Sequence, residues 1–245
     1  MFMVNVQELL DNESQEPDIR SRIMNFDRTS VARLKMRKRT IDVKGEKQIL
    51  ATNPPCTKEN FTVGLAVRAD GTKEKAIVVF KVGTKDGKMS KRMKNSLRIP
   101  ENVTVFSARK ALWNSKLDLE WIEQTFPERD EKENYLLRDH FQPHYCNDSA
   151  ALLDDKNVSQ ILILKSQTDK YQPLDVAVIK SFKSHFEKLC QKFIRKQVMG
   201  NIVTPAGNLK APSKNEYLEM VSKAWKAVET NTITNAFRKS FESFL

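Results

Sequence analysis

The chain has 245 residues, of which 42 are Lys or Arg and 31 are Asp or Glu, so its formal net charge at pH 7 is +11. This excess of cations favours a polyanionic partner, because clustered basic side chains gain affinity when phosphate groups release their counterions. No apolar run approaches the roughly 20 residues of a membrane-spanning helix. The composition therefore excludes a membrane-embedded class and favours partners rich in phosphate.

The first third of the chain combines a short strand with a basic run. Residues 1–20 are acidic and polar and predict a short lead-in segment. Residues 22–27 predict a buried strand that ends at Asp27. Cations dominate residues 33–39, a pattern typical of a solvated loop, a phosphate-contacting loop or a nuclear localisation patch. The sequence alone leaves these three interpretations open.

A β-hairpin is the clearest local prediction. Residues 61–67 and 76–80 are rich in β-forming side chains and flank the turn dipeptide Asp70-Gly71. Residues 83–98 then predict a second basic loop, and residues 103–106 a short strand. Together with the strand at 22–27, the hairpin predicts three consecutive antiparallel strands.

Helices and strands alternate in the second half. Apolar spacing predicts a helix at 117–126, a strand at 135–137, and a helix capped by Asn147 with Ala150, Ala151 and Leu153 facing inward. Residues 161–164 form a continuous apolar run, typical of a strand buried on both faces. The remaining predictions are a long amphipathic helix at 172–198, a loop at 200–213, and two short helices around Trp225 and Phe237.

Three aspartates lie where open α/β sheets collect their chemistry, at strand ends and at the start of a helix. Asp27 and Asp139 follow predicted strands, and Asp175 falls in the first turn of the long helix. Three converging carboxylates need a cation, and hard oxygen ligands suit Mg²⁺ or Mn²⁺. Two such ions would activate a nucleophile and stabilise the leaving oxygen of a phosphodiester. With 31 acids in the chain, position alone does not separate this triad from unrelated aspartates.

Other constellations carry less chemistry. His140, His144 and Cys146 have metal-binding side chains but lack a fourth ligand nearby, so a loop beside Asp139 is favoured over zinc. The sequence contains neither a Walker-type phosphate loop nor a G-x-S-x-G elbow. No nucleotide cofactor and no serine-hydrolase activity are therefore expected.

Three motifs form one pattern along the chain. They are residues 23–29 (IMNFDRT), residues 135–144 (YLLRDHFQPH) and residues 172–186 (QPLDVAVIKSFKSHF), with 35 residues between Asp139 and Asp175. In this order and spacing they resemble the DDE-type transposase domain of the pogo/Tigger/jerky and centromere-protein-B-like group. The motifs correspond to that family's N-M-D-E-T strand, its second-aspartate strand and its Q-P-L-D helix. The resemblance covers roughly residues 20–245.

The resemblance implies an α/β fold, namely an RNase H-like (retroviral-integrase-like) mixed sheet flanked by helices. Residues 1–20 would be a lead-in, 21–200 the catalytic core, and 201–245 a C-terminal helical extension of the same domain. It implies metal-dependent DNA strand cleavage and strand transfer in the nucleus, with Asp27, Asp139 and Asp175 as catalytic residues and ligands of two Mg²⁺ or Mn²⁺ ions. DNA is the implied partner, and a homodimer is left open. The side chains expected to contact DNA are Arg37, Lys38, Arg39, Lys91, Arg92, Lys94, Lys180 and Lys183.

The sequence also departs from the family pattern. Arg28 stands where the family has Glu beside the first aspartate, and residues 166–171 differ from the usual loop before Q-P-L-D. Family members carry helix-turn-helix modules before this domain, whereas about 20 residues precede the first strand here. These departures favour the alternative of a domesticated, catalytically silent nucleic-acid-binding protein, and the three carboxylates favour an enzyme. An RNA-binding domain is disfavoured because no stacking-aromatic motif is found.

Overall fold

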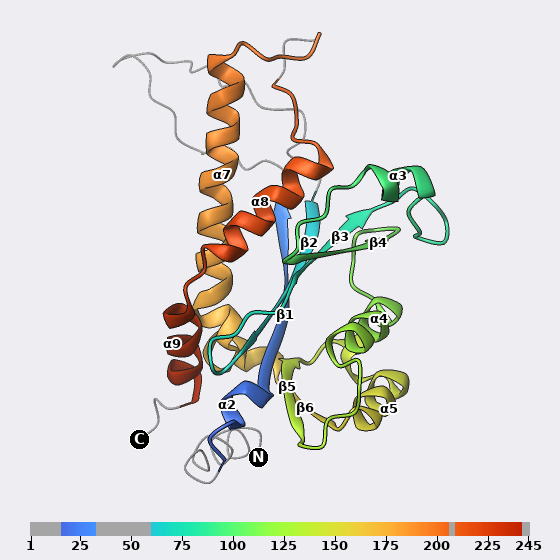
Figure 1. The fold of residues 1–245 in the computed structure, drawn as a ribbon, viewed down its shortest axis with the longest axis vertical. Helices are drawn as coiled ribbons and strands as arrows, with labels where there is room; N and C mark the ends of the chain where they lie inside the picture. The colour runs from blue at the N-terminus through green and yellow to red at the C-terminus, as the bar shows by residue number, and fades with distance from the viewer. Residues whose placement is uncertain (1–15, 33–59, 206–208, 242–245) are drawn as a thin grey trace.

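A six-stranded mixed sheet forms the centre of the protein (Figure 1). The computed structural model describes residues 16–32, 60–205 and 209–241. The strand order is β4-β3-β2-β1-β5-β6. Strands β1, β2 and β3 are antiparallel neighbours, whereas β4, β5 and β6 each run parallel to the adjacent strand. The strands are β1 (Ile23–Ala32), β2 (Asn60–Arg68), β3 (Ala76–Lys81), β4 (Val103–Ala108), β5 (Asn134–Asp139) and β6 (Val158–Ile163).

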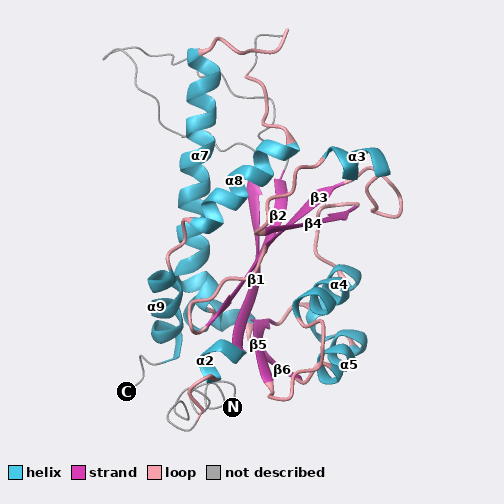
Figure 2. Cartoon of the chain, in the orientation of Figure 1, coloured by secondary structure: helices cyan, strands magenta, loops and turns pink. Residues whose placement is uncertain are grey.

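Helices cover both faces of the sheet (Figure 2). The long helix α7, with α8 and α9, packs on one face, and α4 and α5 pack on the other. The described helices are α2 (Ile19–Arg22), α3 (Lys91–Ser96), α4 (Ser115–Thr125), α5 (Asn147–Asp155), α6 (Thr168–Tyr171), α7 (Ile179–Met199), α8 (Lys214–Lys226) and α9 (Thr230–Phe241). None of the helices in the described ranges is long and apolar enough to cross a membrane.

The period-two alternation of strand side chains divides the core into two clusters. On β1, Met24 and Phe26 face α4 and α5, and Phe26 stacks on Trp121 with ring centroids 4.1 Å apart. The α7 face holds the larger cluster, in which Phe182 of α7, Trp225 of α8 and Phe237 of α9 are completely or almost completely buried. The two C-terminal helices therefore share one core with the sheet.

The β2–β3 hairpin confirms the prediction made from its turn dipeptide. Gly71 has a φ of +94°, and the carboxylate of Asp70 accepts a hydrogen bond from the backbone N–H of Thr72 at 2.8 Å. A Cβ on Gly71 would lie 2.4 Å from a methyl carbon of Thr230 at the start of α9. Glycine is therefore required both by the left-handed backbone and by the close approach of α9.

Several local predictions are wrong, each because burial depends on neighbours that a short segment does not reveal. Strand β6 is the sheet edge and is mostly half-buried, whereas the apolar run predicted burial on both faces. Ala150 and Ala151 are exposed, and α5 instead buries Ser149 and Leu153. Asn147 is the first residue of α5 and does not cap it, since Cys146 occupies the cap position.

Two further segments are more ordered than the sequence predicts. The basic stretch 83–98 contains helix α3, which Ser90 caps by accepting a hydrogen bond from the N–H of Met93. Strand β1 does not end at Asp27, because its antiparallel pairing with β2 continues to Ala32. The basic run at 33–39 lies outside the described residues.

Candidate active site

The register of two parallel strands brings the first two aspartates together. Asn25 on β1 lies opposite Leu137 on β5, where the parallel pairing of the two strands ends. Asp27 and Asp139 each lie two residues further along, so the pleat directs both toward the face that α7 covers. The sequence predicted that the two aspartates would lie close together because both were placed at the carboxyl ends of strands. The parallel register of β1 and β5 explains how they meet.

A buried amide fixes the helix that carries the third aspartate. The side chain of Asn25 is fully buried, and its Nδ2 donates to the carbonyl of Leu137 at 3.0 Å. Its Oδ1 accepts from the backbone N–H of Leu174 at 2.9 Å. Leu174 begins a π-helical turn, Leu174–Val178, which continues directly into α7, and Asp175 lies in this turn. Asn25 therefore links β1, β5 and the start of the long helix, and so positions Asp175 near the two strand carboxylates.

Asp27 and Asp175 form a carboxyl pair that favours a proton. Asp27 is 7% exposed, and burial, followed by the nearby charges of Asp175 and Asp139, raises its pKa to about 8. Loss of solvation also raises the pKa of Asp175, and a side-chain hydrogen bond with Asp27 partly offsets this increase. The pair therefore holds a proton near neutral pH when no cation is present.

Asp139 has the opposite electrostatic environment. The Nη2 of Arg28 lies 3.0 and 3.2 Å from its two carboxylate oxygens, and the Nδ1 of His144 lies 3.0 Å from Oδ1. Burial raises the pKa of Asp139, but the hydrogen bond with His144 and the charge of Arg28 outweigh it and lower the pKa. The guanidinium of Arg28 also packs 4.0 Å from the ring centroid of Phe141. Arg28 therefore neutralises Asp139 from a fixed position.

A buried polar network lies behind Asp139. His144 is fully buried, and its Nε2 lies 3.7 Å from Oδ1 of Asp118. Asp118 accepts hydrogen bonds from Arg138 at 3.0 Å, from the indole of Trp113 at 2.9 Å and from the hydroxyl of Ser149 at 2.9 Å. Arg138 also donates to the carbonyl of His144 at 3.1 Å. This network fixes the backbone and the ring that orient Asp139.

Sequence reasoning missed the supporting residues Asn25, Asp118 and Arg138. The sequence does contain a hint of two of them, because each is a charged residue among apolar ones: Asp118 lies inside the apolar stripe of α4, and Arg138 follows the apolar residues of β5. The loop of His140, His144 and Cys146 lies beside Asp139 as the sequence favoured. Within the described ranges these three side chains do not form a metal-binding group.

The chemistry of the carboxylates fits a divalent cation, although Arg28 competes with it. Oxygen ligands from three carboxyl groups suit Mg²⁺ or Mn²⁺, and a bound cation would oppose the burial and the carboxylate charges that raise the pKa of Asp27. Among the residues that the structure describes, however, no three acidic, His or Cys side chains are arranged as a formed metal site. The guanidinium of Arg28 contacts both oxygens of Asp139, so its positive charge and hydrogen bonds compete with a metal ion for them.

The basic side chains predicted to bind nucleic acid divide between two places. Lys180 and Lys183 are exposed on α7 shortly after Asp175, and the charge of Lys183 lowers the pKa of Asp175. The exposed side chains of Lys91, Arg92 and Lys94 lie on α3, beside the opposite edge of the sheet at β4. The other three residues of the prediction, Arg37, Lys38 and Arg39, lie outside the described residues.

The order of the six strands and the helices that cover both faces of the sheet give the chain an RNase H-like fold. The Mos1 strand transfer complex shares this fold with a TM-score of 0.57 and 12% identity, over 98% of this chain and 58% of that chain. The Mos1 mariner paired end complex with Mn gives the same values. The corresponding complex with Mg has a TM-score of 0.54 and covers 97% of this chain and 58% of that chain, at 12% identity.

The chain belongs to the DDE superfamily endonuclease family, whose model matches residues 58–237. That range contains Asp139 and Asp175 but not Asp27. Two relatives are described as "Pogo transposable element with KRAB domain", one from Mus musculus at 26% identity and one from Homo sapiens at 25%, each over 207 residues. The alignments cover 82% of this chain and 32% of each relative, so the chain spans about a third of the length of the relatives it matches.

Proposed function

We propose that the protein is a transposase-derived endonuclease domain that cleaves and joins DNA strands with two Mg²⁺ or Mn²⁺ ions, and that it acts in the nucleus. The observation that carries the proposal is the convergence of Asp27, Asp139 and Asp175 from two parallel strands and one helix, with the pKa of Asp27 raised by burial and then by the charges of the other two. Family membership and the Mos1 complexes with Mn and Mg support the choice of chemistry.

The three aspartates would hold the metal ions. When bound, two such ions would activate the attacking water or 3′-hydroxyl and stabilise the leaving oxygen. Asp27 and Asp175 would lose the proton that they hold in common, since only ionised carboxylates bind the cations well. Asn25 keeps the start of α7 at a fixed distance from β1 and β5, which positions Asp175.

Two other groups act around the carboxylates. His144 orients Asp139 through its contact at 3.0 Å, and Arg28 would compete with a cation for the Asp139 oxygens. Lys180 and Lys183 would hold phosphates of the DNA backbone beside Asp175, because both are exposed on the adjoining turns of α7.

The second candidate function is a silent DNA-binding protein that kept the fold. The observation that favours it is the contact of Arg28 with Asp139, because a guanidinium there opposes metal binding. On this alternative the basic side chains, such as Lys180 and Lys183, would still bind DNA, while the three aspartates (the carboxylate site) would catalyse no reaction.

The deciding experiment measures nicking of supercoiled plasmid in Mg²⁺ or Mn²⁺ by the full 245-residue chain, with the Asp139→Asn variant as control. We expect metal-dependent nicking that the variant loses. Intact plasmid together with salt-sensitive DNA binding in a gel-shift assay would support the silent protein instead. Nicking that persists unchanged in Asp139→Asn would show that a contaminant or another site is responsible.

A further inference from the structure

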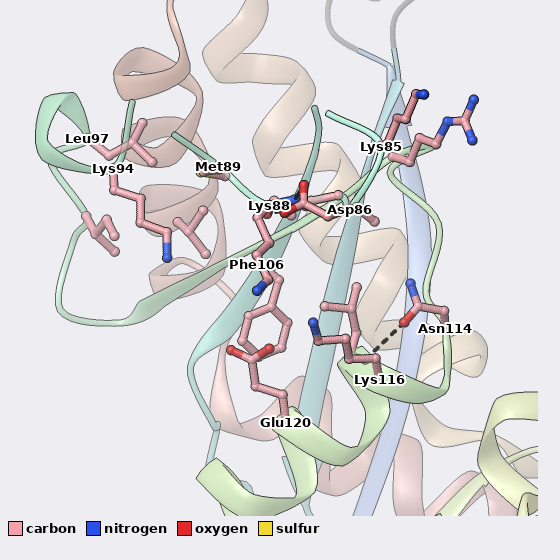
Figure 3. Close-up of a pocket in the computed structure, with 17 residues that line it drawn as sticks. Lys85, Asp86, Lys88, Met89, Lys94, Leu97, Phe106, Asn114, Lys116 and Glu120 are labelled. Carbon is pink, nitrogen blue, oxygen red and sulfur yellow. Dashed lines mark hydrogen bonds between the residues drawn. The ribbon is translucent and has the colours of Figure 1, made fainter. Parts of the chain in front are cut away.

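A pocket lies at the edge of the sheet opposite β5 and β6, away from the three aspartates. Its volume is about 530 Å³, and it is enclosed by residues 85–89, helix α3, strand β4 and the start of α4 (Figure 3). Two strands, β3 and β2, separate β4 from β1, so at about 4.8 Å per strand the pocket lies roughly 14 Å from the strand of Asp27. We call it the β4 pocket, and it shares no lining residue with the carboxylate site.

Cations dominate the lining of the β4 pocket. Five basic residues from separate segments contribute to it, against the two acids Asp86 and Glu120. None of the five forms an ion pair with another residue in the part of the chain that the structure describes, although the charge of Lys88 helps to lower the pKa of Asp86. All five are exposed, so water solvates them, and together they present a positive field that attracts an anion. The five residues are Lys85, Lys88, Lys94, Arg109 and Lys116.

The cations converge over an apolar wall. In Figure 3, Lys88, Lys94 and Lys116 extend toward the space around the ring of Phe106, where the carboxylate of Glu120 also lies, whereas Lys85 points away from it. Leu97 and Ile99 also line the pocket, and Ile99 is 49% exposed although it is a large hydrophobic residue. Asn114 caps the first turn of the 11-residue helix α4 at the pocket, so the positive end of that helix dipole adds to the field.

We propose that the β4 pocket binds a nucleotide of single-stranded DNA, with its phosphate among Lys88, Lys94 and Lys116 and its base against Ile99 and Leu97. Charge complementarity selects the phosphate, and the exposed side chain of Ile99, beside the half-buried Leu97 and above the buried Phe106, offers the base an apolar contact, the combination that proteins use to hold single strands. The volume of the pocket lies within the range of sites that bind small ligands. The proposal rests on the proposed function only in taking DNA as the partner, since the pocket contains none of the three aspartates.

The test measures the affinity of the full chain for a labelled oligothymidine of twelve nucleotides, by fluorescence anisotropy in EDTA over a series of salt concentrations. We expect the double variant Lys94→Glu/Lys116→Glu to bind at least tenfold more weakly. The slope of log affinity against log salt should fall by about 1.4, because each lost phosphate contact to a single strand removes about 0.7. The matched control is Lys75→Glu/Lys110→Glu, which changes the charge equally at two exposed positions outside the pocket.

Two further measurements identify the ligand as a nucleotide. Ile99→Ser should weaken oligothymidine binding about fivefold with an unchanged salt slope, because it removes a base contact and no charge. Poly-glutamate of equal charge should compete poorly. Equal competition by poly-glutamate, or no effect of Ile99→Ser, would overturn the nucleotide assignment and leave a surface that attracts any polyanion.

The outcome is separable from that of the proposed function. Asp139→Asn should bind oligothymidine as the parent does in EDTA even if it no longer nicks plasmid. If Lys94→Glu/Lys116→Glu and its control bind equally well, the β4 pocket is not a DNA site, whatever the plasmid assay shows. Should the glutamate variant fail to fold by circular dichroism, Lys94→Gln/Lys116→Gln makes the same test with a smaller expected loss of about threefold.

Discussion

Replacing Arg28 by glutamine should strengthen metal binding at the carboxylate site. The guanidinium of Arg28 contacts both oxygens of Asp139, at 3.0 and 3.2 Å, from a side chain that is 14% exposed. A metal ion that binds the same oxygens of Asp139 competes with this interaction, and a hydrogen bond to a charged group contributes about 1.5–3 kcal/mol. Since about 1.4 kcal/mol corresponds to a tenfold change in affinity, Arg28→Gln should bind Mn²⁺ about 10- to 100-fold more tightly.

The assay is titration of the full chain with Mn²⁺, with free Mn²⁺ followed by electron paramagnetic resonance, so that no catalysis is needed. Arg28→Lys keeps the charge but cannot both contact Asp139 with a planar group and pack on Phe141, so its affinity should lie between those of the parent and Arg28→Gln. Arg195→Gln makes the same chemical change at an exposed position near the far end of α7 and should leave affinity unchanged.

One result would refute this reasoning. If Asp139→Asn abolishes Mn²⁺ binding while Arg28→Gln binds no more tightly than the parent, Arg28 leaves Asp139 without cost, and its contact does not oppose the cation. Destabilisation of Arg28→Gln in EDTA, reversed by saturating Mn²⁺, would instead support an exchange of one cation for another at Asp139.

Three further predictions address the protonation and the support of the site. In EDTA, the protonated Asp27 should stabilise the fold fully below about pH 4, and this contribution should be lost as pH rises toward 8, because Asp27 ionises at lower pH in the unfolded state. In urea titrations, the free energy of unfolding should therefore fall by up to about 1.4 kcal/mol per pH unit over this range. Asp27→Asn should lack this slope. Asp118→Ala should lower the free energy of unfolding by about 3–5 kcal/mol, since it leaves Arg138 buried without its partner, and a loss under 1 kcal/mol would contradict the network. Asn25→Ala removes two buried hydrogen bonds and should lower the free energy of unfolding by about 2–4 kcal/mol in the same urea assay. It should also weaken plasmid nicking, because α7 loses its link to β1. Unchanged nicking by the fully folded variant would contradict the positioning role of Asn25.

Local chemistry was sufficient to predict two elements of the fold, one of which leads into the site. The β-forming residues around Asp70-Gly71 and the motif that begins at Gln172 predict a hairpin and the start of a long helix, and the structure confirms both. Proximity of Asp27 and Asp139 also followed from placing both near the carboxyl ends of strands. The hairpin and the helix start depend on neighbours within a few residues, which the sequence shows directly, whereas the proximity of the two aspartates came from the general rule on strand ends.

Other features depend on partners far along the chain. The apolar run at 161–164 looks the same whether a strand lies at the centre of a sheet or at its edge, and β6 proves to be an edge. The ion pair of Asp118 and Arg138 joins α4 to β5, and nothing in either segment alone names the other. The contact of Arg28 with Asp139 likewise spans 111 positions, so the sequence showed an unusual residue but not the carboxylate that it neutralises.

Two separate obstacles to metal binding follow from this geometry. The first is the proton favoured by Asp27 and Asp175, which leaves as pH rises through about 8. The second is the guanidinium on Asp139, which Arg28→Gln removes at any pH. The two obstacles are coupled, because the charge of Arg28 also lowers the pKa of Asp27, so Arg28→Gln frees Asp139 but raises the pH at which Asp27 loses its proton. The two effects on Mn²⁺ affinity should therefore not simply add, and binding by Arg28→Gln should be tightest at high pH. If that variant binds Mn²⁺ tightly at high pH and still leaves plasmid intact, metal loading is not what limits cleavage, and the silent DNA-binding function gains the support that Arg28 alone does not give it.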